Sequence, residues 1–292
     1  MNSLSNTIRY LVQIGWYSSL ILITRKVFRT ESKCFKKYRG QFTGDGVEIA
    51  GPSSIFKTNG YYPVYALARS LDNVNYSPQT RWHGEMDRGS QFIFNNEKTP
   101  GTQIINEAGA LTDVKSRSYD FLISNHMLEH SANPIKVLCE WKRVVRDDGL
   151  LLIALPHKDG TFDHRRPLTT LKHLVEDHQR NTGEDDDTHI PEIMELHDRG
   201  RDYSNPTIEK LSKWMSNNKE TRGAHHHVFN SLLAAQLMDY AGFEILDIEI
   251  SLPSDIFMIV RNTPAGRKIS NSQFLDGRSK YLQSSPFHSD KY

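Results

Sequence analysis

The protein has 292 residues, of which 37% are hydrophobic and 24% are charged, and its 36 Lys and Arg residues nearly balance its 35 Asp and Glu residues. This composition excludes collagen, coiled coils, wholesale disorder and proteins with several membrane spans. A formal net charge of +1 gives no general attraction to a polyanion such as nucleic acid. Two cysteines, Cys34 and Cys139, do not form a disulfide framework, which favours a reducing compartment and predicts a cytoplasmic protein.

Residues 1–40 are predicted to form an N-terminal helix followed by a basic segment. The apolar stretch at residues 10–24 reads YLVQIGWYSSLILIT, and it is shorter than the about 20 residues that a membrane span needs. It also lacks the basic start and cleavage site of a signal peptide. Residues 25–39 then hold seven basic residues and one acid. Two interpretations stay open: the helix packs on the main domain, or it lies on an anionic membrane surface.

Short apolar runs alternate with helical periods between residues 41 and 262. We expect strands at residues 47–50, 71–76, 103–106, 119–124, 150–155, 244–250 and 256–260, and helices at 62–69, 134–145 and 230–241. This alternation predicts an α/β fold with a doubly wound, mostly parallel, Rossmann-like sheet of seven strands. The tight turn at 252–254 makes the last two strands an antiparallel edge hairpin. Residues 263–292 are rich in Ser, Lys, Arg and Pro and are expected to form a flexible tail.

A long insertion, at about residues 157–227, separates the fifth strand from the last helix. Eleven of the thirteen histidines lie between His126 and His227. Ligands of such folds bind beyond the carboxyl ends of the strands, so an insertion at this edge is the expected place for a substrate lid. The histidines have three interpretations: a substrate pocket with a general base, a metal site, or an incidental feature of a polar surface. Outside the HMLEH segment at 126–130 no two histidines have HxxxH-type spacing, and no metal is assigned.

Within the pocket interpretation, His157 is the favoured catalytic base, since it directly follows the fifth strand and an imidazole accepts protons near neutral pH. His130 is the second candidate. Substrate binding is assigned to Arg165 and Arg166, which could clamp a phosphate or carboxylate or else pair with nearby acids. His225 and His226, which precede the last helix, are further substrate-binding candidates.

Three segments together resemble a known family: VEIAGP at 47–52, YDFLISNHMLEH at 119–130 and WKRVVRDDGLLLIALPH at 141–157. They are similar to class I S-adenosylmethionine-dependent methyltransferases of the type 11 kind, over about residues 45–160 and, by topology, over 229–261. Family members commonly carry E-x-G-x-G-x-G after the first strand. This chain instead has Ala50, Pro52 and Ser54 at the glycine positions, and only Gly51 remains, outside the usual register.

The resemblance implies S-adenosylmethionine as the cofactor and assigns residues to its parts. Glu48 would meet the amino group, and Asp72 or Asn75 would bind the ribose. The other positions implied are the loop residues Ala50, Gly51 and Pro52, the pair Glu107 and Ala108 at the adenine, and Asn125 and His126 over the methionine arm.

The predicted function is methyl transfer to an oxygen, or less favourably a nitrogen, of a small polar acceptor such as a sugar or glycan intermediate. The alternative is a non-catalytic binding or scaffold protein with a degenerate cofactor loop. Methylation of nucleic acid ranks last, because no NPPY-like base-flipping segment follows the fourth strand. The expected partner is therefore a small molecule, without nucleic acid and with peripheral membrane contact through residues 10–39 left open.

Overall fold

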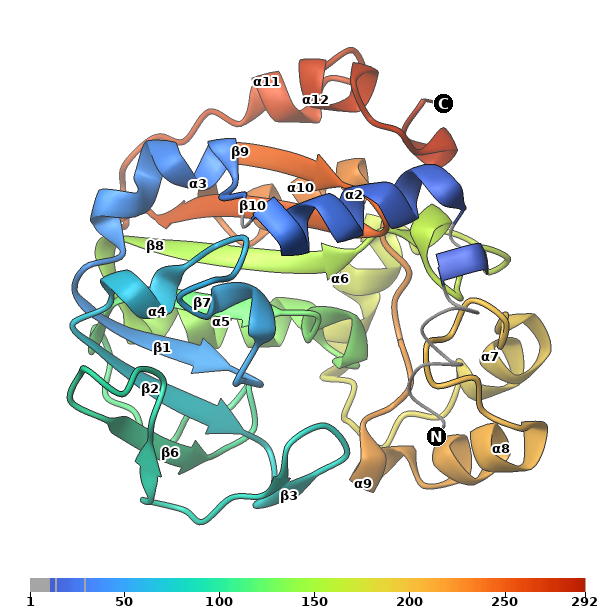
Figure 1. The fold of residues 1–292 in the computed structure, drawn as a ribbon, viewed down its shortest axis with the longest axis horizontal. Coiled ribbons are helices and arrows are strands. Elements are labelled where there is room, and N and C mark those ends of the chain that lie inside the picture. The colour runs from blue at the N-terminus through green and yellow to red at the C-terminus, as the bar shows by residue number, and fades with distance from the viewer. Residues whose placement is uncertain (1–10, 14, 29, 292) are drawn as a thin grey trace.

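The structure is a computed structural model that describes residues 11–13, 15–28 and 30–291. Its centre is an eight-stranded sheet in the order β5-β6-β2-β1-β7-β8-β10-β9 (Figure 1). The strands are β1 (Asp45–Ile49), β2 (Ser70–Asn75), β5 (Gln91–Phe92), β6 (Gly101–Ile105), β7 (Tyr119–Asn125), β8 (Val145–Pro156), β9 (Phe243–Ser251) and β10 (Asp255–Asn262). Two further strands, β3 (Gln79–Thr80) and β4 (Gly84–Glu85), form a separate ribbon.

The central strands are parallel and the two edges are antiparallel. β1 pairs in parallel with β2 and β7, β2 with β6, and β7 with β8. β10 runs antiparallel to both β8 and β9, so the predicted edge hairpin is confirmed. The doubly wound, mostly parallel sheet is confirmed as well. Its eighth strand, β5, was not predicted, because a two-residue antiparallel strand leaves no periodicity to detect.

Helices and aromatic side chains cover the two faces of the sheet. On one face pack α5 (Pro134–Val144), α6 (Leu171–Arg180) and α10 (Ser231–Tyr240). The other face is covered by α3 (Lys33–Tyr38), α4 (Val64–Leu67) and a group of Phe and Tyr rings. Strand β8 shows why both faces need a cover: Leu151, Ile153 and Leu155 point into the first layer, and Leu150, Leu152 and Ala154 into the second. A strand buried on both faces reads as a continuous apolar run.

Helix ends follow local chemistry. Asn133 caps α5 by accepting a hydrogen bond from the Lys136 amide, and Pro134 occupies the first helical position. Asn230 caps α10 in the same way. The helix expected at 62–69 is only the four-residue α4, because Pro63 restricts the residue before it to extended conformations and delays the start of the helix.

The insertion lies beyond the carboxyl ends of the strands, on the right of Figure 1. It contains α6, α7 (Ile190–Leu196), α8 (Ile208–Ser216) and α9 (Asn218–Thr221). A small apolar core of its own, made by Ile193, Leu211, Met215 and Ala224, joins α7 to α8. The insertion is therefore a packed helical layer facing the expected ligand edge.

The C-terminal segment differs from the expected flexible tail. Residues 263–291 include α11 (Ser272–Leu275), α12 (Lys280–Gln283) and a final turn, His288–Asp290. Asp290 is buried and accepts hydrogen bonds from the amide and the hydroxyl of Ser231, at 2.9 and 2.7 Å. The carboxylate therefore sits at the N-terminus of α10, where the helix dipole stabilises negative charge. Composition alone does not reveal such an anchor.

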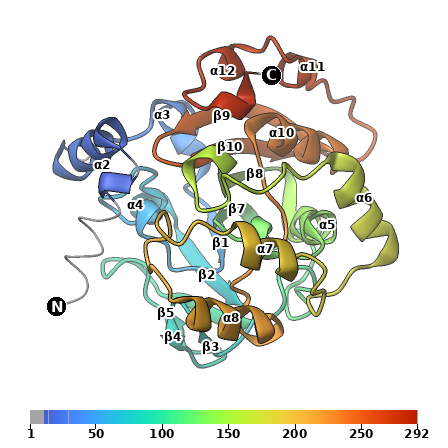
Figure 2. The same cartoon turned by 90° about the vertical axis from the view of Figure 1, so that its right-hand side faces the viewer.

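The N-terminal segment forms α2 (Trp16–Phe28) within the part of the chain that the structure describes, whereas residues 1–10, 14 and 29 lie outside it. Figure 2 places α2 at the rim of the molecule, on the side opposite α6. No helix among the described residues is long and apolar enough to cross a membrane.

Candidate functional site

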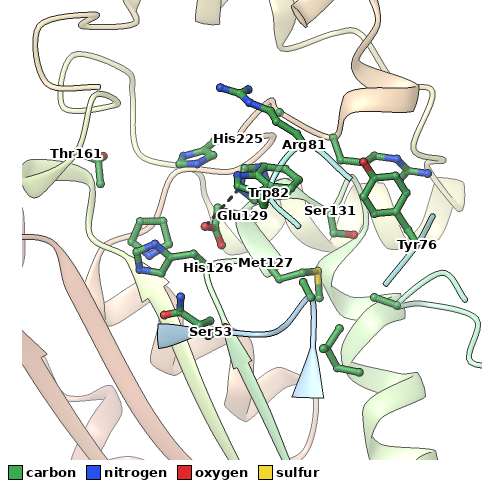
Figure 3. A pocket seen from close by; sticks show the side chains of 18 of the residues that line it. Ser53, Tyr76, Arg81, Trp82, His126, Met127, Glu129, Ser131, Thr161 and His225 are labelled. Carbon is green, nitrogen blue, oxygen red and sulfur yellow. Dashed lines mark ion pairs between the residues drawn. The ribbon is translucent and has the colours of Figure 1, made fainter. Parts of the chain in front are cut away.

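A cavity of about 680 Å³ lies between the carboxyl edge of the sheet and the insertion (Figure 3). Its floor is formed by the segments that follow β1, β2, β6 and β7, and its roof by α7, α8 and the segment before α10. This volume lies within the roughly 300–1,000 Å³ of small-molecule sites. The cavity is thus where the topology places a ligand.

The loop after β1 turns its backbone amides toward the protein. The Gly51 amide donates to Asn73 Oδ1 at 3.0 Å, and the Gly51 carbonyl accepts from the side-chain amides of Asn73 and Asn75 at 3.1 and 3.0 Å. Ala50 and Pro52 line the cavity, and Ala50 adopts a φ of 63°. That left-handed conformation normally favours glycine, so the loop keeps a glycine-like backbone at this position without a glycine.

Glu48 does not reach the cavity. Its side chain is fully buried beneath the loop, where the carboxylate accepts hydrogen bonds from the Ser53 amide and the Tyr65 hydroxyl. Burial raises the pKa of Glu48 to about 7, against the lowering effect of those two donors. The expectation that Glu48 meets the cofactor's amino group is therefore corrected: this carboxyl supports the loop from below.

The cavity wall after β2 and β6 carries polar groups suited to a nucleoside. Asn75 and Tyr76 follow from β2, and Glu107 and Ala108 lie beyond β6. Arg222 reaches across from the insertion, donating to Glu107 at 2.6 Å while its guanidinium lies 5.2 Å from the centre of the Tyr76 ring. Burial raises the pKa of Glu107, and Arg222 opposes this shift.

Of the two alternatives for the ribose, only Asn75 lines the cavity. Asp72 lies earlier on β2, where its carboxylate accepts hydrogen bonds from the Thr102 amide at 2.7 Å and from the Tyr119 hydroxyl at 2.8 Å. Asp72 is therefore a sheet-stabilising residue. Within the described chain, Oδ1 of Asn75 has no hydrogen-bond partner and stays available to a ligand.

Beyond β7 the cavity is lined by Asn125, His126 and Glu129. His126 is held at 2.9 Å from Asp255 Oδ1. Glu129 is fully buried, and neither of its carboxylate oxygens has a hydrogen-bond partner among the described residues. Burial raises the pKa of this carboxyl. An unpaired buried carboxyl is costly, so Glu129 marks the point where a polar ligand would be held, and Figure 3 shows it among the side chains of the cavity.

Two histidines stand beside Glu129. Nδ1 of His130 donates to the Ala224 carbonyl at 3.0 Å, and its Nε2 lies 3.8 Å from Glu129 Oε1. Burial lowers the pKa of His130 well below its usual value, and the neighbouring His225 adds to this. The ring is therefore neutral at pH 7.

His225 is oriented by a buried carboxylate. Its Nδ1 lies 2.5 Å from Asp163 Oδ2, and Nε2 has no hydrogen-bond partner in the described chain. Asp163 also accepts from Arg166 at 3.0 Å. Burial raises the pKa of Asp163, but its contacts with His225 and Arg166 lower it by more. The pKa of Asp163 therefore lies well below its usual range. The result is an aspartate–histidine pair with its second ring nitrogen unused at the cavity wall.

His157, the favoured base, lies outside the cavity. It is fully buried, and its ring stacks on Phe287 with 3.9 Å between ring centres. Its Nδ1 accepts from the Asp159 amide at 3.1 Å, and its Nε2 lies 3.2 Å from Asp290 Oδ1. Nδ1 is thus held by the adjacent turn and Nε2 by the C-terminal segment, so the catalytic assignment to His157 is corrected to a structural one.

Three substrate-binding candidates are also used by the fold. Arg165 is exposed and pairs with Asp198 at 3.0 Å. Arg166 is buried and bridges Asp163 and Glu192, while the His226 ring contacts the Asn218 amide at 3.2 Å. None of these three side chains lines the cavity, whereas His225 and His130 do.

Several cavity residues escaped the sequence reasoning because nothing in their local pattern marks them. An aromatic wall consists of Trp82, Phe162, Tyr203 and Trp214. The guanidinium of Arg81 lies 3.4 Å from the centre of the Trp214 ring. Glu129 was overlooked because it reads as the start of a helix in HMLEH, although a carboxyl between two histidines is a recognisable signal.

The residues present fit S-adenosylmethionine at its nucleoside end. Asn75 offers a free carbonyl oxygen at the end of β2, and Glu107 with Ala108 offers a carboxylate beside a small residue. The β1 loop fits less closely, because its Gly51 and Ser53 amides already bond to Asn73 and Glu48. The cavity therefore suits the cofactor at its nucleoside end, whereas the Gly51 and Ser53 amides of the β1 loop are already used.

Comparisons with known proteins agree with this architecture. No curated protein matches the sequence. Similar solved structures include an S-adenosylmethionine-dependent methyltransferase from Methanosarcina mazei (11% identity, 80% of this chain and 99% of that one, TM-score 0.43). Another is a putative S-adenosylmethionine-dependent methyltransferase from Listeria monocytogenes (15% identity, 79% and 96%, TM-score 0.43). Residues 53–248 match the family model described as a methyltransferase domain. Since this match spans more than half of the chain, the protein belongs to the methyltransferase-domain family, with S-adenosylmethionine as its cofactor.

Proposed function

We propose that the protein transfers a methyl group to a hydroxyl oxygen of a small polar acceptor, such as a sugar or a glycan intermediate. The observation that carries this proposal is the pair of His225 and Asp163 at the cavity wall, beside Glu129, whose carboxylate oxygens accept no hydrogen bond from the described residues. A proton acceptor and a hydrogen-bond acceptor are what a reacting hydroxyl group requires.

Each residue has a separate task in this mechanism. When bound, S-adenosylmethionine supplies a methyl group that is already activated by the positive sulfur. The proton that leaves the acceptor hydroxyl goes to Nε2 of His225. Asp163 fixes the ring through Nδ1 and stabilises the positive imidazolium that results, as a buried aspartate does in a catalytic triad.

The lining of the cavity supports a sugar as the acceptor. Glu129 accepts a hydrogen bond from a second hydroxyl group, which would satisfy its buried oxygens. Trp82 and Trp214 line the same space, where Arg81 stacks on Trp214. A sugar matches this combination, because its C–H faces pack on aromatic rings while its hydroxyl groups donate to carboxylates and imidazoles.

The test is an acceptor panel with the purified full-length chain and S-adenosylmethionine. We expect S-adenosylhomocysteine to form with mono- or oligosaccharides and not with amines or carboxylates that lack a hydroxyl group. Turnover with amines alone would contradict the proposal. If the protein neither turns over any acceptor nor gains thermal stability from S-adenosylhomocysteine, the non-catalytic alternative is favoured instead.

We also propose that α2 contacts an anionic membrane surface. Its side chains Trp16, Leu20 and Ile23 are 80, 49 and 49% exposed, and their spacing of four and three residues places them on one helix face. The exposed Lys33 and Lys36 follow directly. An apolar face beside cations is the usual arrangement of an interfacial helix.

Vesicle sedimentation tests the membrane contact. The chain should sediment with vesicles that contain phosphatidylserine, and less so in high salt, because the lysine contribution is screened. Replacing Leu20 and Ile23 by serine should abolish the binding, whereas Tyr240→Ser, which changes an exposed apolar residue on α10, should not. Equal sedimentation of all three proteins would exclude α2 as the contact.

A further inference from the structure

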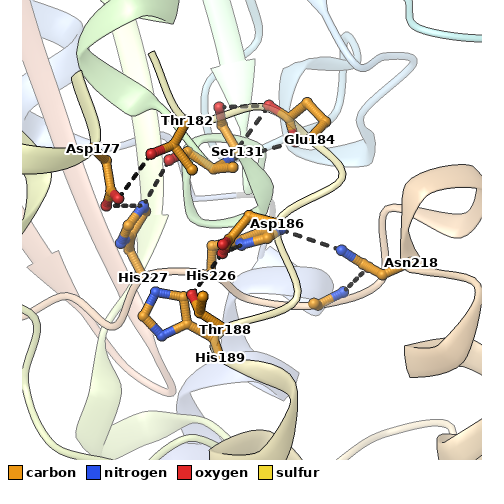
Figure 4. A network of polar contacts seen from close by, with 12 residues as sticks. Ser131, Asp177, Thr182, Glu184, Asp186, Thr188, His189, Asn218, His226 and His227 are labelled. Atoms are coloured by element: carbon orange, nitrogen blue, oxygen red, sulfur yellow. Dashed lines mark hydrogen bonds and ion pairs between the residues drawn. The ribbon is translucent and has the colours of Figure 1, made fainter. Parts of the chain in front are cut away.

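A second cluster of titratable side chains lies outside the cavity, between α6 and the segment before α10. One ring nitrogen each of His173, His189 and His227 lies within 4.8 Å of the others. Asp177, one helical turn after His173, adds a carboxylate whose Oδ2 is 3.2 Å from Nε2 of His173. Figure 4 shows His227 beside Asp177, with 3.8 Å between its Nε2 and Asp177 Oδ2, and His189 on another segment.

Hydrogen bonding alone does not account for the contacts of His173. Its Nε2 lies 3.2 Å from Nε2 of His189 and 3.2 Å from Asp177 Oδ2. An imidazole nitrogen carries at most one hydrogen, so that hydrogen can satisfy only one of these two neighbours. If Nε2 of His173 carries no hydrogen and instead accepts one from His189, it has none to donate to Asp177. An unprotonated nitrogen then lies 3.2 Å from Asp177 Oδ2. In each arrangement at least one of the two contacts lacks a full hydrogen bond of its own.

Two buried atoms of the cluster are also without a hydrogen bond. Asp177 Oδ2 and His227 Nδ1 have no hydrogen-bond partner among the described residues, although Asp177 is 7% and His227 1% exposed. Burying a polar atom without a partner costs on the order of 1–3 kcal/mol. Two such atoms beside two crowded imidazoles indicate that the cluster is built for a cation.

We propose that His173, His189 and His227 bind a zinc ion that ties α6 and the residue before α7 to the segment leading into α10. Three imidazoles form a donor set that zinc accepts, with the fourth tetrahedral position left to a water molecule. Two ligand atoms bound to one tetrahedral zinc at about 2.0–2.1 Å stand about 3.3 Å apart. The 3.2 Å separation between Nε2 of His173 and Nε2 of His189 corresponds closely to one edge of that tetrahedron.

The surroundings orient these ligands. Nε2 of His227 faces two acceptors, the Ala132 carbonyl at 3.4 Å and Asp177 Oδ2 at 3.8 Å. This favours a proton on Nε2 and leaves the lone pair of Nδ1 for the metal.

The position of the site gives the metal a structural role. Its ligands come from α6, from the residue before α7 and from the segment 225–227. His227 is two residues from His225, which lines the cavity. A zinc ion would therefore fix the backbone that carries His225 without entering the cavity. Metal binding itself does not depend on the proposed methyl transfer, so either proposal can fail alone.

Metal binding is tested on the full chain purified without a histidine tag, stripped with a chelator and titrated with Zn²⁺ alone. We expect one equivalent to bind and the melting temperature to rise. His189→Ala should weaken binding by more than the roughly 10- to 100-fold typical of losing an outer-shell partner. The control is His178→Ala. His178 lies on α6, as His173 does, but outside the cluster, so its loss should leave the affinity for zinc unchanged.

Two further measurements keep the proposal falsifiable. The wild-type chain loaded with Co²⁺ should show the intense visible absorption of a tetrahedral site, a readout that does not depend on how a variant folds. Glu129→Gln tests whether zinc binds instead at the other possible ligand group, which consists of Glu129, His130 and His225. This variant should leave zinc binding intact. Failure of the wild type to bind Zn²⁺, or loss of binding in Glu129→Gln but not in His189→Ala, would overturn the assignment.

Discussion

Replacing His225 by glutamine is expected to lower kcat by roughly 10²- to 10⁴-fold, the range by which a positioned general base accelerates a reaction. The substitution removes the imidazole ring, and with it the basic nitrogen proposed to take the acceptor's proton. The amide nitrogen of glutamine does not accept a proton. Asp163 keeps Arg166 as a partner at 3.0 Å, so the variant does not leave an uncompensated buried charge and should fold. Affinity for S-adenosylhomocysteine should stay within a few-fold of the wild type. The measurements are single-turnover kinetics and calorimetric titration.

A matched control exists in the insertion. His164 forms the same kind of pair, with Nε2 3.0 Å from Asp198 Oδ2, but it does not line the cavity. His164→Gln should therefore retain wild-type turnover. Zinc content must be measured in both variants, because His225 is close in sequence to His227. A His225→Gln enzyme with full activity would refute the proposed base, and an equal loss in His164→Gln would point to a general disturbance of the insertion.

The sheet was predictable because its signal is local. The strands β7 and β8 contain apolar runs bounded by turn residues, and the strand predicted at 150–155 lies within β8, which begins earlier, at Val145. The packed C-terminal segment was not predictable in the same way. It depends on one contact between residues far apart in the sequence, Asp290 with Ser231 at the start of α10. Composition describes a segment but not the partner that orders it.

The site was predictable only where topology decides it. Residues directly after parallel strands, such as Asn75, Glu107 and His126, do line the cavity. His157 also follows a strand, yet its ring turns to the C-terminal segment, because Asp290 and Phe287 offer it partners there. Within the insertion, the sequence does not tell which histidines line the cavity. His225 and His226 are adjacent, but only His225 reaches it.

Removing polar side chains at the nucleoside end should weaken cofactor binding. We propose that Asn75 Oδ1 accepts from a ribose hydroxyl and that the Glu107 carboxylate binds beside it. Loss of a hydrogen bond costs about 0.5–1.5 kcal/mol, or about 1.5–3 kcal/mol where a charged group takes part. Asn75→Ala should therefore weaken S-adenosylhomocysteine binding by up to about 10-fold and Glu107→Ala by about 10- to 100-fold. Calorimetric titration gives both values.

Asp72→Asn is the control that separates this site from the other ribose candidate. It lies on the same strand as Asn75, but its carboxylate bonds to Tyr119 and Thr102 instead of facing the cavity. We expect a small loss of thermal stability and an unchanged dissociation constant. If Asp72→Asn weakens cofactor binding as much as Glu107→Ala does, Asp72 contributes to the cofactor site. That result would contradict the placement of the ribose at Asn75. Unchanged affinity in both Asn75→Ala and Glu107→Ala would instead place the nucleoside elsewhere along the carboxyl edge. The ordinary acid at the end of the second strand is an asparagine here, so the residual affinity of Asn75→Ala also measures how much of the binding Glu107 supplies.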